Sequence, residues 1–471
     1  MNSIVVKDAV SRYEELGFRA PVNLSIDSSE SVAIVGPNAS GKSLLVDMIV
    51  GKNPLFSGKV ERDPNIRYIT FRDSYGAADS GYYLQQRWNT TEYEDVPLVR
   101  KALGRFPESD LQKKLFAMFG MDELMDKPLI LLSSGELRKY QLTKALLGCP
   151  RIMIIDNPFV GLDAQTRDQF RDLLSQLCVL DGLQIILVLS MLDDIPQFII
   201  SVVPVSDRTV GEKLSREDYL KKFKEEYADP DCSDIQKRIL DLPYLNRNYE
   251  GDEVVKLNAV SIRYDDRTIL KELDWTVKRG QKWALSGQNG SGKSTLLSLI
   301  CADNPQAYAC DISLFGYQRG TGESIWDIKK HIGYVSPEMH RAYYKNVPVI
   351  DVVSSGMHDK VGLFLKPRPE QMAVYEFWLD IFGVLHLKDK SFVQISSGEQ
   401  RLVLLARAFV KDPELLILDE PLHGLDTYNR AKVKKIIEAF CSRNDKTMIM
   451  VTHYKEELPE VITDSLFLVR N

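Results

Sequence analysis

The stretch GQNGSGKST at Gly287–Thr295 decides the fold, and a second version of it, GPNASGKS, occurs at Gly36–Ser43. Both match the pattern G-x-x-x-x-G-K-[ST], in which glycines let successive backbone N–H groups surround phosphate oxygens at the start of a helix. The lysine of the pattern neutralises the β- and γ-phosphates, and the hydroxyl residue holds Mg²⁺. Two such loops predict two sites for ATP with Mg²⁺. The residues predicted to bind ATP are Gly36, Asn38, Gly41, Lys42 and Ser43 in the first loop and Gly287, Asn289, Gly290, Ser291, Gly292, Lys293, Ser294 and Thr295 in the second.

The two loops belong to an internal repeat that covers most of the chain. Lys42 and Lys293 are separated by 251 residues, and later pairs such as Asp156 and Asp419 by 263. A length of 471 residues also exceeds what one core usually organises. We therefore predict a first domain over 1–205, a charged linker over 206–250 and a second domain over 251–471.

Each copy contains apolar runs that end in an acidic residue. RIMIID (Arg151–Asp156) and LLILDE (Leu415–Glu420) are typical of buried parallel strands. Strands that alternate with helices predict a doubly wound α/β architecture, with ligands at the carboxyl ends of the strands.

Composition limits the class of protein. No apolar run approaches the roughly eighteen residues needed to cross a bilayer, and the N-terminus lacks a signal peptide. The six cysteines form no CxxC pair, which favours reduced thiols and a cytoplasmic location, with a peripheral one at the inner face of the membrane as a further option. A net charge of −6 makes nucleic acid an unlikely partner.

Short motifs between the loops and the acidic strands narrow the class further. LSSGE (Leu132–Glu136) and ISSGE (Ile395–Glu399) precede helical stretches, and GLD follows each acidic strand. These motifs resemble the signature, usually LSGGQ, and the D-loop of ATP-binding cassette (ABC) ATPases. The resemblance covers both halves and implies two cassettes, each with a P-loop core sheet and a helical subdomain, and no membrane domain.

In that family two cassettes pair head to tail and enclose two ATP molecules, each between the phosphate loop of one cassette and the signature of the other. The resemblance implies the same intramolecular pairing here. The implied signature residues are Ser133, Ser134, Gly135 and Glu136 and, in the second copy, Ser396, Ser397, Gly398 and Glu399. The implied Mg²⁺ residues are Ser43 and Asp156 in the first copy and Ser294 and Asp419 in the second.

A tyrosine lies at the place of the family's adenine-stacking aromatic in each copy. Tyr13 and Tyr264 both precede the lysine of their loop by 29 residues. An ordinary strand tyrosine is the simpler interpretation of either residue alone, but the equal spacing favours stacking on adenine.

The two copies differ where hydrolysis is expected. Glu420 is placed to polarise the attacking water, and His453 matches the family's H-loop histidine, so these two and Lys293 are the predicted catalytic residues. Asn157 and Ser190 occupy the equivalent places in the first copy. Because an amide accepts no proton at neutral pH, the first site is predicted to hold ATP without cleaving it, unless Asp163 substitutes as the base.

The Q-loop glutamine of ABC cassettes, which contacts Mg²⁺ and meets the membrane domain, is missing. Pro337, followed by Glu338, takes its place in the second copy and Phe71 in the first, although Gln85 or Gln86 would substitute if the first loop were longer. Coupling to a membrane domain is therefore in doubt.

Three functions remain open. The chain is similar to ModF-type tandem ATPases, which implies the ATP-binding component of a molybdate-related transport system with an integral-membrane permease subunit as partner. An ABC-F translation factor would bind ribosomes, but Asn157 and the mixed-charge linker count against it. A nucleotide-gated regulator outside transport shares all of the chemistry.

Overall fold

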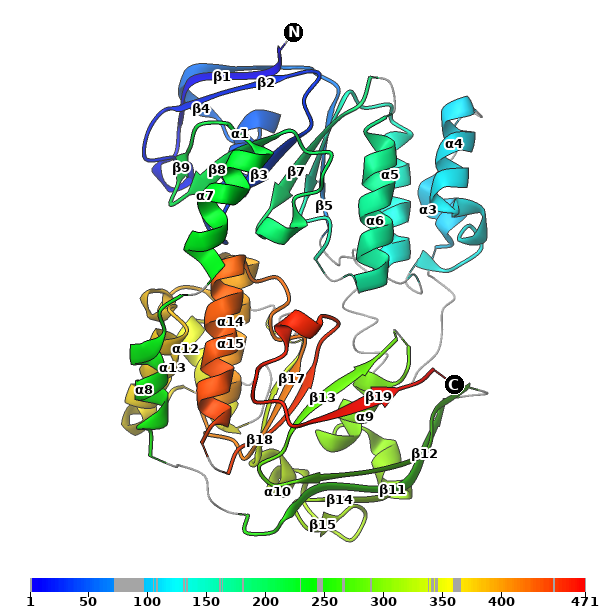
Figure 1. The fold of residues 1–471 in the computed structure, drawn as a ribbon, viewed down its shortest axis with the longest axis vertical. Helices are drawn as coiled ribbons and strands as arrows, with labels where there is room; N and C mark the ends of the chain where they lie inside the picture. The colour runs from blue at the N-terminus through cyan, green and yellow to red at the C-terminus, as the bar shows by residue number, and fades with distance from the viewer. Residues whose placement is uncertain are drawn as a thin grey trace. The chain divides into compact units, whose positions relative to one another are not determined.

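The computed structural model divides into two compact units, Met1–Glu226 and Tyr227–Asn471. It describes residues 2–71, 97–104, 106, 109–129, 132, 134–160, 162, 164–179, 182–228, 230–243, 249–264, 267–288, 290–337, 339, 343, 346–358, 366–443 and 445–470. Each unit combines a largely parallel sheet, an antiparallel sheet and a set of helices (Figure 1). The predicted α/β class with two similar halves is confirmed.

In the first unit, a three-stranded antiparallel sheet has the order β2-β1-β4, and a seven-stranded sheet has the order β10-β8-β3-β7-β6-β5 with β9 on β8. The strands are β1 (Asn2–Ser11), β2 (Val22–Asp27), β3 (Val32–Val35), β4 (Leu55–Arg62), β5 (Ile66–Thr70), β6 (Ile152–Asp156), β7 (Gln184–Leu189), β8 (Ser201–Ser206), β9 (Thr209–Val210) and β10 (Leu214–Ser215). The helices are α1 (Lys42–Val50), α3 (Val99–Leu103), α4 (Asp110–Phe119), α5 (Ser134–Leu146), α6 (Ala164–Leu177) and α7 (Arg216–Ala228).

In the second unit, a four-stranded antiparallel sheet has the order β12-β11-β14-β15, and a five-stranded parallel sheet has the order β16-β17-β18-β13-β19. The strands are β11 (Glu253–Tyr264), β12 (Arg267–Lys278), β13 (Lys282–Gly287), β14 (Asp311–Leu314), β15 (Tyr317–Gln318), β16 (Ile332–Val335), β17 (Leu415–Asp419), β18 (Thr447–Val451) and β19 (Asp464–Leu468). The helices are α8 (Ser233–Leu240), α9 (Lys293–Ile300), α10 (Ile325–Lys329), α12 (Val349–Ser354), α13 (Met372–Ile381), α14 (Ser397–Phe409) and α15 (Thr427–Cys441).

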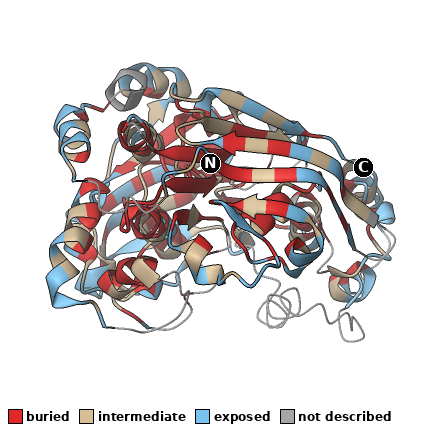
Figure 2. Cartoon of the chain, turned by 90° about the horizontal axis from the view of Figure 1, so that it is seen from below, coloured by how far each residue is buried: buried red, intermediate tan, exposed pale blue. Residues whose placement is uncertain are grey.

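The parallel strands of the two units follow the same order. The sequence β5-β6-β7-β3-β8 in the first unit corresponds to β16-β17-β18-β13-β19 in the second. The edge strands β5 and β19 are only partly buried. The central strands β3, β6, β7, β17 and β18 are largely apolar and almost wholly buried, in the interior that is red in Figure 2. Their burial on both faces explains why they appear in the sequence as continuous apolar runs rather than alternating ones. In each unit the phosphate loop leaves a strand that has neighbours on both sides, so a rigid sheet positions it.

The segment predicted as a charged linker, 206–250, is largely built into the two units. Its first residues form β9 and β10, which pair with β8 of the first unit. Farther along, α8 packs on α15 of the second unit, with Ile239 fully buried. Tyr249 then donates its backbone N–H to Glu414 Oε1 at 3.0 Å. The structure thus divides the chain between Glu226 and Tyr227, within α7, rather than across a separate linker.

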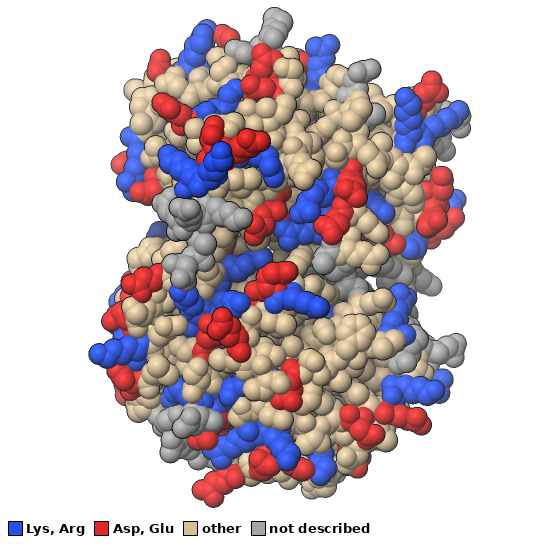
Figure 3. All heavy atoms as spheres, viewed as in Figure 1, with Lys and Arg blue, Asp and Glu red and all other residues tan. Residues whose placement is uncertain are grey.

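Acidic and basic side chains alternate over the face of the molecule drawn in Figure 3. This mixture agrees with the near balance of 60 basic and 66 acidic residues in the whole chain.

Candidate ATP-binding and hydrolytic sites

Both phosphate loops end on a glycine that opens a helix. Gly41 precedes α1 with φ +106, and Gly292 precedes α9 with φ +96. Residues with a side chain rarely adopt this left-handed backbone, so the pattern requires glycine at these two positions. The helices begin directly at the lysines, which leaves their first backbone N–H groups facing the loops, where an anion binds.

The first glycine of each loop lies against a neighbouring strand. A Cβ added at Gly36 would lie 1.9 Å from the carbonyl oxygen of Val205, and one at Gly287 would lie 2.4 Å from that of Leu468. Neither position therefore accepts a side chain unless the loop moves away from the sheet. The loops are held close to β8 and β19 by this packing.

The two lysines lie over their own loops. Lys42 Nζ donates to the carbonyl oxygens of Gly36 and Pro37, at 2.8 and 2.6 Å. Lys293 Nζ makes the equivalent hydrogen bonds to the first two residues of its loop, at 2.7 and 3.1 Å. The ammonium groups are thus positioned where they could exchange carbonyl oxygens for phosphate oxygens.

One hydroxyl group in each loop fits a phosphate ligand. Ser40 Oγ and Ser291 Oγ are equivalent atoms of the repeat, and both are buried without a hydrogen-bond partner in the part of the chain that the structure describes. Because a buried hydroxyl normally finds a partner, these two suit a group that arrives from outside. Asn38, Gly290 and Thr295 lie on the same loops and helix starts, whereas Asn289 lies outside the described residues.

The predicted Mg²⁺ residues supply hard oxygen donors. Ser43 and Ser294 are exposed at the starts of α1 and α9, and Asp156 and Asp419 close β6 and β17. A serine hydroxyl and a carboxylate are ligands that Mg²⁺ accepts alongside phosphate oxygens and water. In both cassettes the residues present therefore fit the ion.

The predicted adenine-stacking tyrosines are held differently. Tyr264 closes β11, and its Oη accepts a hydrogen bond of 3.0 Å from Asn304 Nδ2. Tyr13 is 48% exposed, and the equivalent asparagine, Asn53, instead donates to the carbonyl oxygen of Leu16 at 3.2 Å. The phenol of the second cassette is thus anchored through its hydroxyl group, and its ring is partly buried.

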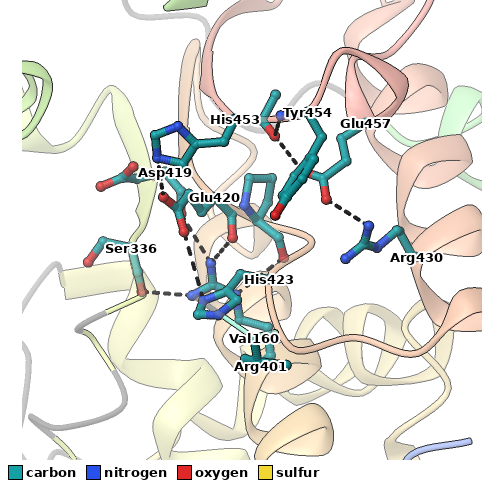
Figure 4. Close-up of polar contacts among 12 residues, drawn as sticks. Val160, Ser336, Arg401, Asp419, Glu420, His423, Arg430, His453, Tyr454 and Glu457 are labelled. Atoms are coloured by element: carbon teal, nitrogen blue, oxygen red, sulfur yellow. Dashed lines mark hydrogen bonds and ion pairs between the residues drawn. The ribbon is translucent and has the colours of Figure 1, made fainter. Parts of the chain in front are cut away.

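Glu420 has a strained backbone next to the end of β17. Its φ is +47, which is uncommon for a residue with a long side chain, and its backbone N–H donates to Val451 O at 2.9 Å. Such strain concentrates at functional sites because it aims a side chain. His453 Nε2 lies 3.1 Å from Glu420 Oε1, and His423 Nδ1 lies 3.8 Å from Oε2 (Figure 4).

The pKa of Glu420 lies below its ordinary value. Burial raises it, but the hydrogen bond to His453 and the charges of His423, His453 and Arg401 together outweigh burial. The carboxylate is therefore ionised at neutral pH, ready to accept a hydrogen bond from water.

The first cassette has the same backbone and different chemistry at this position. Asn157 has φ +46, and its N–H donates to Val188 O at 2.8 Å. Its side-chain oxygen accepts a hydrogen bond of 3.3 Å from Ser190, and its nitrogen donates to Asp156 Oδ1 at 3.0 Å. A second oxygen of Asp156 accepts a 2.9 Å hydrogen bond from Tyr68. An amide between a serine and an aspartate thus stands where the second cassette has a carboxylate beside two histidines.

A buried arginine in α14, not predicted from the sequence, supports the turn that carries Glu420. Arg401, in α14, donates to the carbonyl oxygens of Asp419 at 3.0 Å, of Glu420 and of Ser336 at 2.8 Å (Figure 4). Burial lowers the pKa of Arg401 to about 10, against the opposing charges of Asp419 and Glu420, so the group stays protonated. The equivalent Arg138 donates to the carbonyl oxygens of Pro158 and Val160. The common offset of 263 residues was the signal that could have found this pair.

The signature of the second cassette begins α14 with a capping box. Ser396 Oγ accepts from Glu399 N at 3.3 Å, and Glu399 Oε2 accepts from Ser396 N at 2.8 Å. Ser397 is exposed in the first turn, and Gly398 is buried. In the first cassette Glu136 pairs with Lys127 at 2.7 Å. Gly135 lies in the first turn of α5, which begins at Ser134, whereas Ser133, Gly161 and Asp163 lie outside the described residues.

Phe71 and Pro337 occupy the two positions predicted for the Q-loop glutamine. Phe71 meets Phe170 edge to face at 6.0 Å between ring centroids, and Arg138 lies 5.2 Å from its ring centre. Pro337 follows the buried Ser336. Glu338, Gln85 and Gln86 lie outside the described residues.

Known proteins resemble this chain in sequence and in fold. A family model described as "ABC transporter" matches residues 20–160 and 270–423. The chain is 35% identical over 482 residues to the ABC transporter ATP-binding protein ModF of Escherichia coli (strain K12), covering 100% of this chain and 97% of that protein. It is 28% identical over 466 residues to an uncharacterized ABC transporter ATP-binding protein of Schizosaccharomyces pombe (strain 972), covering 94% and 92%.

A solved structure shares the tandem fold. The archaeal ribosome recycling factor aABCE1, in complex with the ribosomal stalk protein aP1, matches with a TM-score of 0.59 at 18% identity, covering 98% of this chain and 87% of that one. At this identity the likeness concerns the fold alone. Among the described residues, no helix has the length and apolar character needed to cross a membrane. The family model matches both halves, and a relative shares 35% of its residues across the whole length, so the chain belongs to the ABC transporter family as a tandem of two ATP-binding cassettes and is an ATPase.

Proposed function

We propose that the two cassettes close head to tail on two ATP molecules and that only the second cassette cleaves its ATP. In this proposal, the first site combines Lys42, Ser43 and Asp156 with the signature at Ser396–Gly398. The second site combines Lys293, Ser294 and Asp419 with the signature at Ser133–Gly135. The domain division that fits this function is two cassettes, one in each compact unit.

The single observation that supports the asymmetry is the exchange of one hydrogen-bonded pair. Glu420 and His453 lie 3.1 Å apart in the second cassette, and Asn157 and Ser190 lie 3.3 Å apart at the same place in the first. A carboxylate can polarise water, whereas an amide whose oxygen already accepts from a serine cannot take a proton. The substitution keeps the packing and removes the base.

At the second site, each residue has one task. Glu420 orients and polarises a water molecule for in-line attack on the γ-phosphorus, and His453 donates to the γ-phosphate oxygens as negative charge develops. Lys293 exchanges its loop carbonyls for the β- and γ-phosphate oxygens. When bound, Mg²⁺ would neutralise charge on these oxygens, and Ser294 and Asp419 would hold it.

We further propose that the chain is the ATP-binding component of an ABC transport system, supported by its likeness to the ModF protein of E. coli over the full length. Molybdate is the cargo class that the resemblance implies, and a permease subunit is the implied partner. Co-purification of a membrane protein with the ATP-loaded chain would support this, whereas pelleting with ribosomes in a nonhydrolysable ATP analogue would favour a translation factor instead.

The hydrolytic proposal is tested by substituting the equivalent residue in each of the two sites. Glu420→Gln should lower kcat by about 10²–10⁴-fold, the range for loss of a general base, and trap an ATP-loaded form. Asn157→Ala is the matched variant in the first cassette, and its kcat should stay within about threefold of wild type, because no base is lost there. Collapse of hydrolysis in Asn157→Ala together with survival in Glu420→Gln would overturn the proposal.

A further inference from the structure

The loop that carries His453 is held by the side chain of the residue before it. Thr452 Oγ1 accepts a hydrogen bond from the backbone N–H of Tyr454 at 3.2 Å, so its hydroxyl group spans His453. The same hydroxyl group donates to Glu457 Oε2. Thr452 is buried, and β18 ends one residue earlier, at Val451. In the part of the chain that the structure describes, the strand pairing of β18 stops at Val451, and these two hydrogen bonds hold the backbone on either side of His453.

Glu457 connects this loop to the helix that follows the D-loop. It is 6% exposed and closes the short 3₁₀ helix η10 (Lys455–Glu457). Its second oxygen, Oε1, lies 2.9 Å from Arg430 Nη1, in the first turn of α15 (Figure 4). A buried carboxylate whose two oxygens bind different elements holds both in a fixed relation, because releasing either contact would leave a charge poorly solvated.

The first cassette preserves the backbone and the ion pair but lacks the contact with the loop. Arg167 pairs with Asp194, which closes the equivalent 3₁₀ helix η4 (Leu192–Asp194). Asp194 N donates to Met191 O at 3.4 Å, as Glu457 N donates to Tyr454 O at 3.2 Å. Leu189, however, occupies the place of Thr452 and has no hydroxyl group, and Asp194 is one methylene shorter than Glu457. The cassette without the histidine also lacks the groups that would orient one.

From this comparison we infer that Thr452 and Glu457 are positioning residues for His453, tied by Arg430 to helix α15. The inference rests on the proposed role of His453 in hydrolysis. The imidazole must keep its Nε2 near Glu420 in the free cassette and also reach the γ-phosphate oxygens, so a small rotation of the loop moves it out of range. The orientation of a catalytic group mainly affects the transition state. Loss of the contact between Thr452 and Glu457 should therefore lower kcat and leave KM nearly unchanged.

The test uses the full chain with ATP and Mg²⁺, and measures kcat, KM and the unfolding midpoint. Thr452→Val keeps the shape of the side chain and removes the hydroxyl group, and should lower kcat about tenfold, equivalent to about 1.4 kcal/mol, with KM within about twofold. Thr452→Ser restores the hydroxyl group and should recover kcat to within about twofold of wild type. Glu457→Asp introduces the residue that the first cassette has at the equivalent position, Asp194. It should lower kcat to the same extent as Thr452→Val.

The matched control is Asp194→Asn, which alters the equivalent ion pair of the first cassette and should leave kcat unchanged. A wild-type kcat in Thr452→Val would overturn the inference. A Thr452→Ser chain as slow as Thr452→Val would also overturn it, because the hydroxyl group would then not be what orients His453. Failure of the proposed function can be told apart from failure of this inference. The proposed function fails if Glu420→Gln hydrolyses ATP at the wild-type rate. If Glu420→Gln is inactive while Thr452→Val is normal, only the inference fails.

Discussion

His453 Nε2 lies 3.1 Å from Glu420 Oε1, where the carboxyl ends of β18 and β17 meet. Neighbouring parallel strands bring together two residues that are 33 positions apart in the chain. The same strands of the first cassette bring together Ser190 and Asn157. The fold therefore supplies one geometry twice, and the side chains decide what each copy can do.

The lowered pKa of Glu420 makes the stability of the chain depend on this residue at acid pH. An unfolded glutamate binds its proton near its ordinary value of 4.5, and the folded one binds it only at a lower pH. The stabilisation is therefore complete above the unfolded pKa and is lost as the pH falls through the folded pKa. The unfolding midpoint of wild type minus that of Glu420→Gln should stay constant down to about pH 4.5 and shrink as the pH falls further. A difference that grows as the pH falls would contradict the assigned direction.

Arg401 should matter for stability and turnover together. Arg401→Met leaves several buried carbonyl oxygens without a donor, each costing about 1–3 kcal/mol, and releases the turn that carries Glu420. We expect a lower unfolding midpoint and a kcat reduced at least about tenfold at temperatures where the variant is folded. Arg407→Met is the control, since Arg407 is also buried but binds Ser355 at 3.0 Å, away from the catalytic turn. It should lose stability and keep kcat; equal losses of kcat in both variants would remove the special role of Arg401.

Tyr264, the predicted adenine-stacking residue of the second cassette, should act through its ring. Tyr264→Ala should raise KM for ATP about tenfold, since stacking of an aromatic ring on a base contributes about 1–3 kcal/mol. Tyr264→Phe keeps the ring, loses the hydrogen bond to Asn304, and should change KM less than about threefold. Titration of ATP hydrolysis by the three proteins checks this order. A Phe variant as poor as the Ala variant would mean that the hydroxyl group, not stacking, binds the nucleotide.

Helix α8 should behave as part of the second cassette rather than as a flexible connection. Ile239 is fully buried in its core, while the adjacent Leu240 is 51% exposed. Ile239→Ala should destabilise the chain by about 2–4 kcal/mol, and Leu240→Ala by less than about 0.5 kcal/mol. Denaturant unfolding of the two variants provides the comparison. Equal stability of both would show that α8 does not pack on α15 in solution.

The repeat and the parallel strands could be predicted because they depend on local patterns. Continuous apolar runs such as Ile152–Asp156 and Leu415–Asp419 match buried strands, and the loop glycines match backbone angles that other residues avoid. Glu420 and His453 were each predicted from the family's motifs, and the structure adds that the two side chains lie 3.1 Å apart.

Other features depend on tertiary contacts that leave no local pattern. An arginine in a helix is usually exposed, and nothing in the local sequence marks Arg401 as an exception. Only the tertiary structure shows that it is buried against backbone carbonyl oxygens. The segment 206–250 was predicted to be a linker from its charge, yet one buried face suffices to dock α8. The Thr452–Glu457 contact was not predicted, because neither residue alone indicates it. It stands out only when the two residues are compared with Leu189 and Asp194 at the equivalent positions of the first cassette.

If only one of two bound ATP molecules is cleaved, a count of the nucleotides bound during turnover will show it. The wild-type chain is supplied with labelled ATP and Mg²⁺, separated rapidly from free nucleotide and denatured, and its bound ATP and ADP are counted. We expect two nucleotides per chain, of which one remains ATP however long turnover continues. Conversion of both to ADP, or a single nucleotide per chain, would contradict it.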